Sequence, residues 1–322
     1  MDALTVHFPV SGVDTSLFMP PLVAFVVSFF SSMGGVSGAF FLLPYQVSVL
    51  NFVSPSVTST NFVFNIVAIP SGVYRYMREG RLAWPLAGII VAGTLPGVLL
   101  GYYLRVSFLP DPRIFRLFIG CVLLYIAVHL LYATFSEYRT GATPKPHTIP
   151  GPPAGAGPGG GSGDTRRRGA CRQIRTVAFS VRKIDYAFGG ETFSVGIPAL
   201  FTVALVVGII GGAYGIGGGS ILAPFCVAVL KLPVYTVAGA ALLGTFLTSI
   251  AGVVLYSLIP ARAGLSTTPD WMLGILFGIG GIFGMYCGAR LQKHVPQAAI
   301  KTMLAAIMLL LACRYILEYL SA

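Results

Sequence analysis

The sequence predicts an all-α polytopic membrane protein of two inverted repeats, each with a Gly-broken or re-entrant first segment and three full spans. Of 322 residues, 55% are hydrophobic and 10% are charged, whereas soluble proteins average about 45–50% apolar and about 25% charged residues. Apolar stretches of about 20 residues recur, and the two halves of the chain resemble each other. This composition excludes an ordinary soluble enzyme, a disordered chain and a nucleic-acid-binding domain.

The first membrane repeat, residues 1–138, has an unusual first apolar stretch at residues 20–50. It is longer than the roughly 20 residues that one span needs, and its centre reads Gly34-Gly-Val-Ser-Gly38. Glycine costs a helix interior about 1 kcal/mol relative to alanine, so we expect the helix to break here. The segment is then either one discontinuous span or a re-entrant pair that enters and leaves on the same face. Full spans follow at residues 57–77, 84–104 and 114–135.

Residues 139–190 have the composition of a linker. Between Gly141 and Gly163, 14 of 23 residues are Gly or Pro, so no packed core is expected there. Several arginines follow, and residues 176–182 alternate apolar and polar side chains. We expect a basic cytoplasmic linker with a short hairpin on the membrane surface.

The second membrane repeat, residues 191–322, repeats the first. A shift of 180 residues overlays Gly35 on Gly215, Gly38 on Gly218 and Pro44 on Pro224, and a shift of 187 overlays Gly93, Gly97 and Gly101 on Gly280, Gly284 and Gly288. Repeats of this size are typical of secondary transporters. The break recurs as Gly211-Gly-Ala-Tyr-Gly-Ile-Gly-Gly-Gly219, and spans follow at residues 236–259, 271–291 and 298–320.

Basic residues predict the orientation. If each repeat crosses the membrane an odd number of times, the 21 Lys and Arg residues divide 16 to 5 between the two faces, against 14 to 7 for an even number. The stronger asymmetry favours the odd number. We therefore expect a protein of a prokaryotic inner membrane, with both termini outside and the linker in the cytoplasm. Arg105, Arg113 and Arg116 fall on the outer face.

The two breaks are the best candidates for a binding site. A helix that restarts inside a membrane exposes backbone N–H groups and a positive dipole end, and both attract anions. Hydroxyls and amides nearby can contribute. The alternatives are close helix packing by the glycines and interhelical hydrogen bonding by the polar residues. The candidate substrate-binding residues are Gly35, Ser37, Gly38, Ala39, Asn61, Asn65, Gly215, Gly217, Gly218, Gly219, Ser220, Thr245 and Ser249.

Other kinds of site find little support in the sequence. The four histidines have no metal-ligand spacing, and all ten carboxylates fall in expected loops or near segment ends. We therefore expect no catalytic residues, no metal and no cofactor. The expected partners are a small anionic substrate and the lipid bilayer, with a homodimer as one candidate assembly and no nucleic acid.

The paired motifs resemble those of the sulfite exporter TauE/SafE family. The resemblance rests on Gly34-Gly-Val-Ser-Gly38 before Pro44, on Gly215-Ile-Gly-Gly-Gly-Ser-Ile-Leu-Ala-Pro224 and on the later glycine series. It covers both membrane repeats but not the linker. It implies secondary transport of small sulfur-containing oxyanions such as sulfite, thiosulfate or organosulfonates. The two half-sites are unequal, because Ser37 and Ala39 stand where the second repeat has Gly217 and Gly219.

With this resemblance, we expect a secondary transporter that exports small sulfur-containing oxyanions such as sulfite or organosulfonates. It binds the anion through backbone N–H groups at the paired breaks, near the membrane midplane. The alternatives are a transporter of another small organic anion, with or without sodium coupling, an anion channel, and a non-transporting scaffold or sensor that uses the basic linker.

Overall fold

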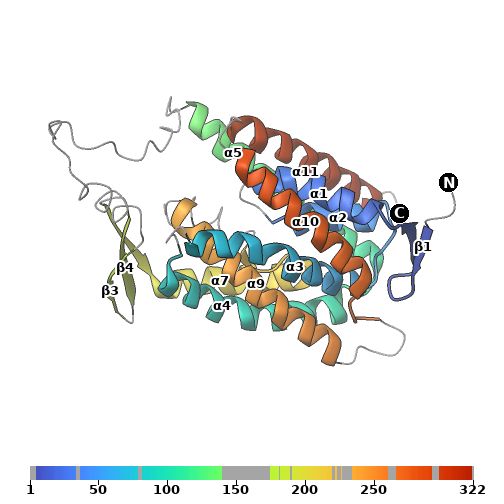
Figure 1. Cartoon of the computed structure of the whole chain (residues 1–322), viewed down its shortest axis with the longest axis horizontal. Coiled ribbons are helices and arrows are strands. Elements are labelled where there is room, and N and C mark those ends of the chain that lie inside the picture. The colour runs from blue at the N-terminus through green and yellow to red at the C-terminus, as the bar shows by residue number, and fades with distance from the viewer. Residues whose placement is uncertain are drawn as a thin grey trace.

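The protein is a helical bundle with two small sheets. The computed structural model describes residues 5–33, 37–78, 82–139, 175–180, 182–188, 191–219, 222, 226, 234–259, 266–291 and 297–320. The helices are α1 Met19–Met33, α2 Ala39–Ser48, α3 Ser56–Arg78, α4 Trp84–Tyr103 with a π-helical segment at Leu104–Phe108, α5 Pro112–Arg139, α7 Ile197–Tyr214, α9 Val234–Leu258, α10 Trp271–Leu291 and α11 Gln297–Leu320 (Figure 1). The predicted all-helical polytopic membrane fold is confirmed.

Five helices in the described part of the chain are long and apolar enough to cross a membrane. They are Trp84–Phe108, Pro112–His129, Ile197–Tyr214, Val237–Leu258 and Trp271–Gly288. Helix α3 has 23 residues but falls outside this group. Its first ten residues are rich in hydroxyl and amide side chains, and all ten are buried. These polar groups therefore face protein rather than lipid.

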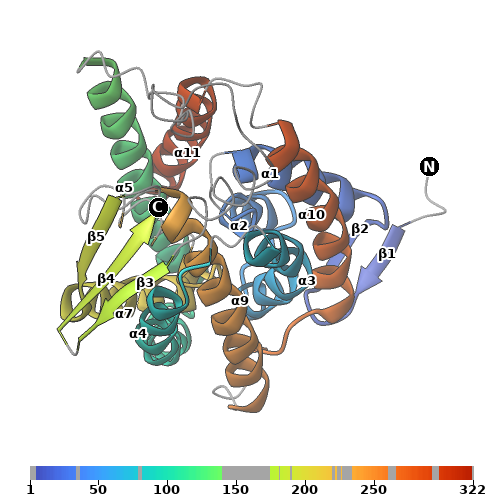
Figure 2. The same cartoon turned by 60° about the vertical axis from the view of Figure 1, so that its left-hand side comes forward.

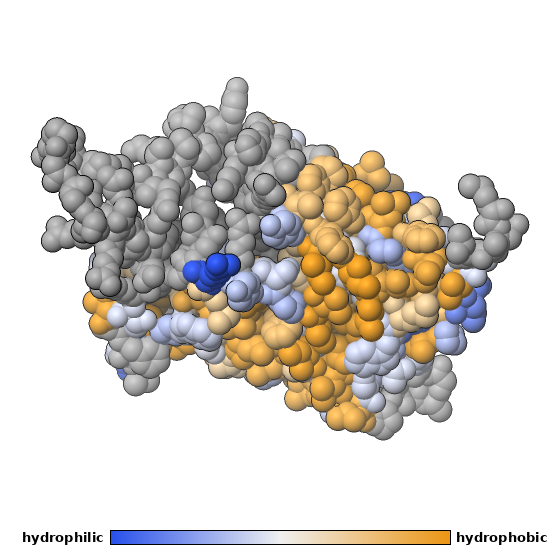
Figure 3. Space-filling view, in the orientation of Figure 1, coloured by the Kyte–Doolittle hydropathy of each residue, from blue (hydrophilic) through white to orange (hydrophobic). Residues whose placement is uncertain are grey.

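The outer surface of the bundle is apolar. Side chains four residues apart on single helices are exposed together, as Ile275, Ile279 and Phe283 are on α10. The view in Figure 3 shows hydrophobic residues covering much of the described surface between more polar ends. An exposed apolar surface of this extent suits contact with lipid.

The two sheets lie at opposite ends of the bundle. The β1–β2 hairpin (Thr5–Phe8, Val13–Ser16) and the end of α11 lie at one end, and the sheet of β3 Arg175–Phe179, β4 Lys183–Phe188 and β5 Glu191–Gly196 lies at the other (Figure 1). The hairpin β1–β2 was not predicted from the sequence. A short hairpin was expected in the linker of residues 139–190, and the pairing of β3 with β4 lies within it. Strand β5, which was placed in the second membrane repeat, leads directly into α7.

The first glycine-broken segment returns to the end from which it starts. The hairpin before α1 is held at the start of α10, because the Ser11 backbone N–H and Oγ donate to Oδ2 of Asp270 over 3.2 and 2.9 Å. Helix α2 ends near the last turns of α11, where Ser48 Oγ and the Tyr315 hydroxyl lie 2.5 Å apart. Helices α1 and α2 therefore have the arrangement of a re-entrant pair.

Each first helix packs on a helix from the other half of the chain. The packing order α1–α10–α3–α9–α4–α7 runs through the bundle, and α5 pairs with α11 (Figure 2). Helices α1 and α7, α3 and α9, and α10 and α4 are equivalent in the sequence repeat. If each helix is replaced by its equivalent, the same series of neighbours results, read from the other end. The packing order is therefore symmetric with respect to the two halves of the chain.

Glycine ridges make the two closest helix pairs. On α4, a Cβ at Gly97 would lie 2.8 Å from Cα of Gly208 on α7. On α10, a Cβ at Gly284 would lie 2.9 Å from Cβ of Ser28 and 3.0 Å from the carbonyl carbon of Phe25 on α1. Small residues let membrane helices approach this closely. The glycines of the later repeat motif therefore hold α1 against α10 and α7 against α4.

Candidate functional site

The first break joins α1 to α2. Residues 34–36, and with them the candidate Gly35, lie outside the described part of the chain. Ser37 and Gly38 precede α2, and Ser37 is 3% exposed. The first N–H groups of α2 were expected to be free, but they are already paired. The Ala39 N–H donates to Ser37 Oγ over 3.3 Å, and those of Phe40 and Phe41 donate to the carbonyls of Ser37 and Gly38 over 3.1 Å each.

The second break follows α7. Gly215 and Gly217 have φ values of +84° and +70°, a left-handed conformation that glycine adopts without strain. Gly215 ends α7, since its N–H donates to the Gly211 carbonyl over 2.8 Å. Gly217 and Gly218 are buried. Within the described residues no hydrogen bond reaches their backbone N–H groups.

The second break has no room for side chains. A Cβ at Gly215 would lie 2.6 Å from the Thr58 carbonyl oxygen, and one at Gly218 would lie 2.9 Å from Thr94 Cβ. A Cβ at Gly219 would collide with the Ala241 carbonyl. Ser220 lies outside the described residues. The chain therefore needs glycine here for both its conformation and its close approach to α3, α4 and α9.

The two breaks meet at Asn65 of α3. Ser37 Oγ donates to Asn65 Oδ1 over 3.1 Å, and Asn65 Nδ2 donates to the Ile216 carbonyl over 3.2 Å. A second link joins the same two segments, because the Tyr214 hydroxyl donates to the Phe40 carbonyl over 3.2 Å. The two rings also stack with their centroids 5.6 Å apart. Segments about 180 residues apart in the sequence thus form one junction.

The same face of α3 carries Asn61 at this junction. Thr58 Oγ1 donates to the Ala213 carbonyl over 3.1 Å. Thr58, three residues before Asn61, and Asn65, four residues after it, therefore both face the second break. Asn61 therefore points the same way. It is fully buried, and neither of its amide atoms has a hydrogen-bond partner in the described part of the protein.

Helix α9 contributes the opposite wall. A Cβ at Gly217 would lie 3.3 Å from Ser249 Oγ and 2.6 Å from the Thr245 methyl group. The Ser249 hydroxyl is buried and finds no partner among the described residues. The Thr245 hydroxyl donates to the Ala241 carbonyl of its own helix over 3.0 Å. Of the two predicted α9 residues, only Ser249 has a free polar group.

Two further residues belong to the junction. Thr94 of α4 contacts Gly218, and Ser28 of α1 lies against Gly38 with its hydroxyl buried and without a partner in the described structure. Both are single polar residues in apolar segments, where sequence alone offers only weak signals. The repeat overlay places Ser28 on Gly208, so the two halves differ here as well.

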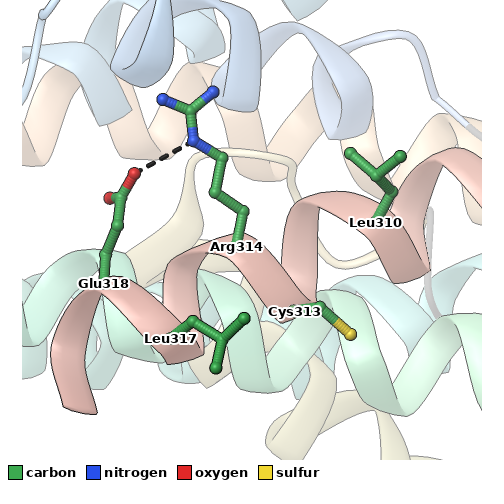
Figure 4. A pocket seen from close by; sticks show the side chains of 5 residues that line it. All are labelled: Leu310, Cys313, Arg314, Leu317 and Glu318. Atoms are coloured by element: carbon green, nitrogen blue, oxygen red, sulfur yellow. Dashed lines mark hydrogen bonds and ion pairs between the residues drawn. The ribbon is translucent and has the colours of Figure 1, made fainter. Parts of the chain in front are cut away.

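A shallow depression on α11 is a weaker candidate. It is lined by Leu310, Cys313, Arg314, Leu317 and Glu318, and Arg314 Nε donates to Glu318 Oε1 over 3.0 Å (Figure 4). Its cation is already paired, and its remaining lining is apolar apart from the Cys313 thiol. No group of three or more His, Cys, Asp or Glu residues in the described ranges is placed to hold a metal ion.

Comparison with known proteins identifies the family. The profile described as Sulfite exporter TauE/SafE matches residues 21–315. The chain belongs to this family. Its members are membrane transporters and not enzymes, so membership supports membrane transport and an integral membrane location.

A curated relative agrees with the family. The probable membrane transporter protein YunE of Bacillus subtilis (strain 168) is 26% identical over 127 residues. That match covers 39% of this chain and 44% of the relative, so it spans less than half of either protein. No solved structure matches the chain.

Proposed function

We propose that this TauE/SafE protein is a secondary transporter that exports small sulfur-containing oxyanions such as sulfite or organosulfonates. The anion binds where the two breaks meet. The Asn61 amide, the Ser249 hydroxyl and the backbone N–H groups of Gly217 and Gly218 are the donors. All four groups are buried around one junction and lack partners in the described structure.

Unpaired buried donors are the observation that carries this proposal. Leaving one buried polar group without a partner costs about 1–3 kcal/mol, and most buried polar groups in proteins are paired. Several such groups at one junction indicate a ligand that completes them. Donors without positive side chains suit a small anion that must be released again. The paired N–H groups of α2 shift the binding role toward the second break and α3.

The packing supports alternating access. We infer two inverted repeats, with α1 held on α10 and α7 held on α4 by the glycine ridges. Rocking the unit that contains α1 and α10 against the unit that contains α7 and α4 would open the junction to each face of the membrane in turn. Ser37, Asn61, Asn65 and Ser249 are at most 3% exposed, as expected for a closed intermediate.

Export follows from the membrane potential. A potential that is negative inside drives an anion outward by about 2.3 kcal/mol per charge per 100 mV. No proton relay is then required. Reconstituted protein should carry current with sulfite or a sulfonate.

An anion panel tests the substrate class. Currents across proteoliposomes are measured with sulfite, thiosulfate, sulfate, sulfoacetate, taurine and acetate. Current with sulfite or sulfoacetate but not acetate supports the proposal. Equal currents with every anion contradict it and favour an anion channel. Absence of current together with absence of labelled-anion exchange, from folded protein, contradicts transport.

A further inference from the structure

Arg105 is a buried cation in the π-helical segment that follows α4. Arg105 was expected on the outer face, just after the span at residues 84–104, but its side chain is fully buried. The segment Leu104–Phe108 widens the helix by one residue per turn, a feature frequent at functional sites. This π-helical segment follows α4 at the end of the bundle that carries the β1–β2 hairpin (Figure 1).

Neutral groups hold the Arg105 guanidinium. Nη2 donates to the Val53 carbonyl over 2.8 Å, and Nη1 donates to the Leu109 carbonyl. The Phe115 ring covers one face, with its centroid 3.5 Å from Cζ. Nε is buried and has no partner, and Arg105 has no carboxylate partner, within the described residues.

An unpaired buried charge calls for an anion. Removing a charge from water costs several kcal/mol unless an opposite charge compensates it, and carbonyl dipoles compensate only part of this cost. A guanidinium binds an oxyanion through two parallel hydrogen bonds that are stronger than those to neutral acceptors. Arg105 is therefore poised to exchange its carbonyl partners for an oxyanion.

Arg105 lies one short helix away from the junction. Its partner Val53 follows Phe52, whose N–H donates to the Gln46 carbonyl of α2 over 2.9 Å. Helix α2 has ten residues, about 15 Å, and its first turn forms part of the first break. The Gln46 amide is fully buried and neither of its polar atoms has a partner in the described structure. A second unsatisfied polar group thus lies between the junction and Arg105.

A second arginine holds the same loop. Arg116 Nη2 donates to Asn51 Oδ1 over 3.2 Å, and its Nε is also buried without a partner in the described part. Asn51 has a φ of +52°, which an asparagine tolerates. Arg116 is partly balanced by Glu318, 3.7 Å away, whereas Arg105 is not balanced. Arg105 is therefore the stronger anion site.

We propose that Arg105 forms a second oxyanion-binding site, on the face of the bundle that carries the β1–β2 hairpin. An oxyanion there replaces the Val53 and Leu109 carbonyls. This frees the α2–α3 and α4–α5 loops, which Arg105 ties together in the closed state. The proposal rests on the proposed function only for the idea that this anion is the transported one.

Calorimetric titration of purified protein with sulfite tests this site. Asn61→Leu removes the junction site, so sulfite bound by this variant reports on Arg105. We expect the variant to keep one sulfite site, and Arg105→Gln in the same background to remove it. Arg105→Lys keeps the charge but loses the paired geometry, and should weaken binding about tenfold or more. The exposed Arg113→Gln makes the same charge change and should leave binding unaltered.

The outcomes separate the two proposals. Sulfite binding that depends on Arg105, in a protein that transports no anion, supports the second site and contradicts the proposed function. Loss of all sulfite binding in Asn61→Leu, or residual binding equal in Arg105→Lys, Arg105→Gln and Arg113→Gln, overturns the second site. Should Arg105→Gln not fold, Arg105→Lys carries the comparison.

Discussion

Asn65 is the residue on which the two halves of the chain meet. Its amide accepts a hydrogen bond from Ser37 and donates one to the Ile216 carbonyl, so one side chain bonds to both breaks. The repeat overlay places Thr245 at the matching position, where its methyl group packs on Gly217. Asn65 thus binds the first break through its amide oxygen, whereas the matching Thr245 contacts the second break through its methyl group. The two halves of the junction therefore differ at this position too.

Asn61→Leu should separate stability from transport. The replacement is close in volume and removes a buried amide that has no partner in the described structure. Removing such a group is expected to leave the melting temperature unchanged or higher, while sulfite flux falls at least about tenfold. Thermal unfolding in detergent and flux in proteoliposomes measure the two effects.

Ser249→Ala should behave in the same way as Asn61→Leu, with Ser71→Ala as its matched control. Ser71 is on the long helix α3, and its hydroxyl already donates to the Ala68 carbonyl over 3.0 Å. Equal flux losses in both serine variants would remove Ser249 from the site.

Gly217→Ala should destabilise the protein. A left-handed conformation costs a residue with a Cβ about 1–2 kcal/mol, and the Cβ would lie 2.6 Å from the Thr245 methyl. Gly88→Ala is the control, because nothing lies within 4 Å of its Cβ position in α4. That change should stabilise the helix by about 0.5–1 kcal/mol. Melting temperatures that move in the same direction would contradict this account of the break.

At the scale of helices and strands, periodicity and glycine spacing predicted some elements but not how they pair. Runs of glycine predicted both breaks, because several glycines in succession destabilise a continuous helix. The pairing of α1 with α10 was not predictable, since a glycine ridge indicates close packing without naming the partner. The paired N–H groups at the start of α2 were also missed, because Ser37 folds back onto its own helix. Hairpin β1–β2 has too few residues for a clear periodic signal.

Gly284→Leu should loosen the contact between α10 and α1. Its side chain would collide with Phe25 and Ser28 on the facing helix, and overpacking of this kind costs about 1–3 kcal/mol. Phe283→Leu, on the exposed face of the same helix, is the control. A fall in melting temperature is expected for Gly284→Leu alone. An equal fall in both would show that the ridge is not the critical contact.

At the scale of the whole molecule, the sequence predicted the class and the structure supplied the assembly. Apolar content, repeated segments and charge asymmetry were enough for a helical membrane protein. Charge counting missed one feature, because Arg105 is a buried cation rather than a loop anchor. Burial of a single arginine depends on the loops that cover it, which no local pattern encodes.

The orientation of the molecule can be tested through its linker. A protease site inserted between Gly151 and Gly163 should be cut in inside-out vesicles and protected in right-side-out cells, because the basic residues favour the cytoplasm. An equivalent site before Thr5 should give the opposite pattern. Cleavage of the linker from outside would overturn the proposed orientation.

Exchange of radiolabelled sulfite across proteoliposomes tests whether the anion binds where the two breaks meet. Native protein, Asn61→Leu and Ser71→Ala are compared at equal amounts of folded protein. We expect rapid exchange in native protein and Ser71→Ala, and little exchange in Asn61→Leu. Exchange at the native rate in Asn61→Leu would contradict the claim that the anion binds where the two breaks meet.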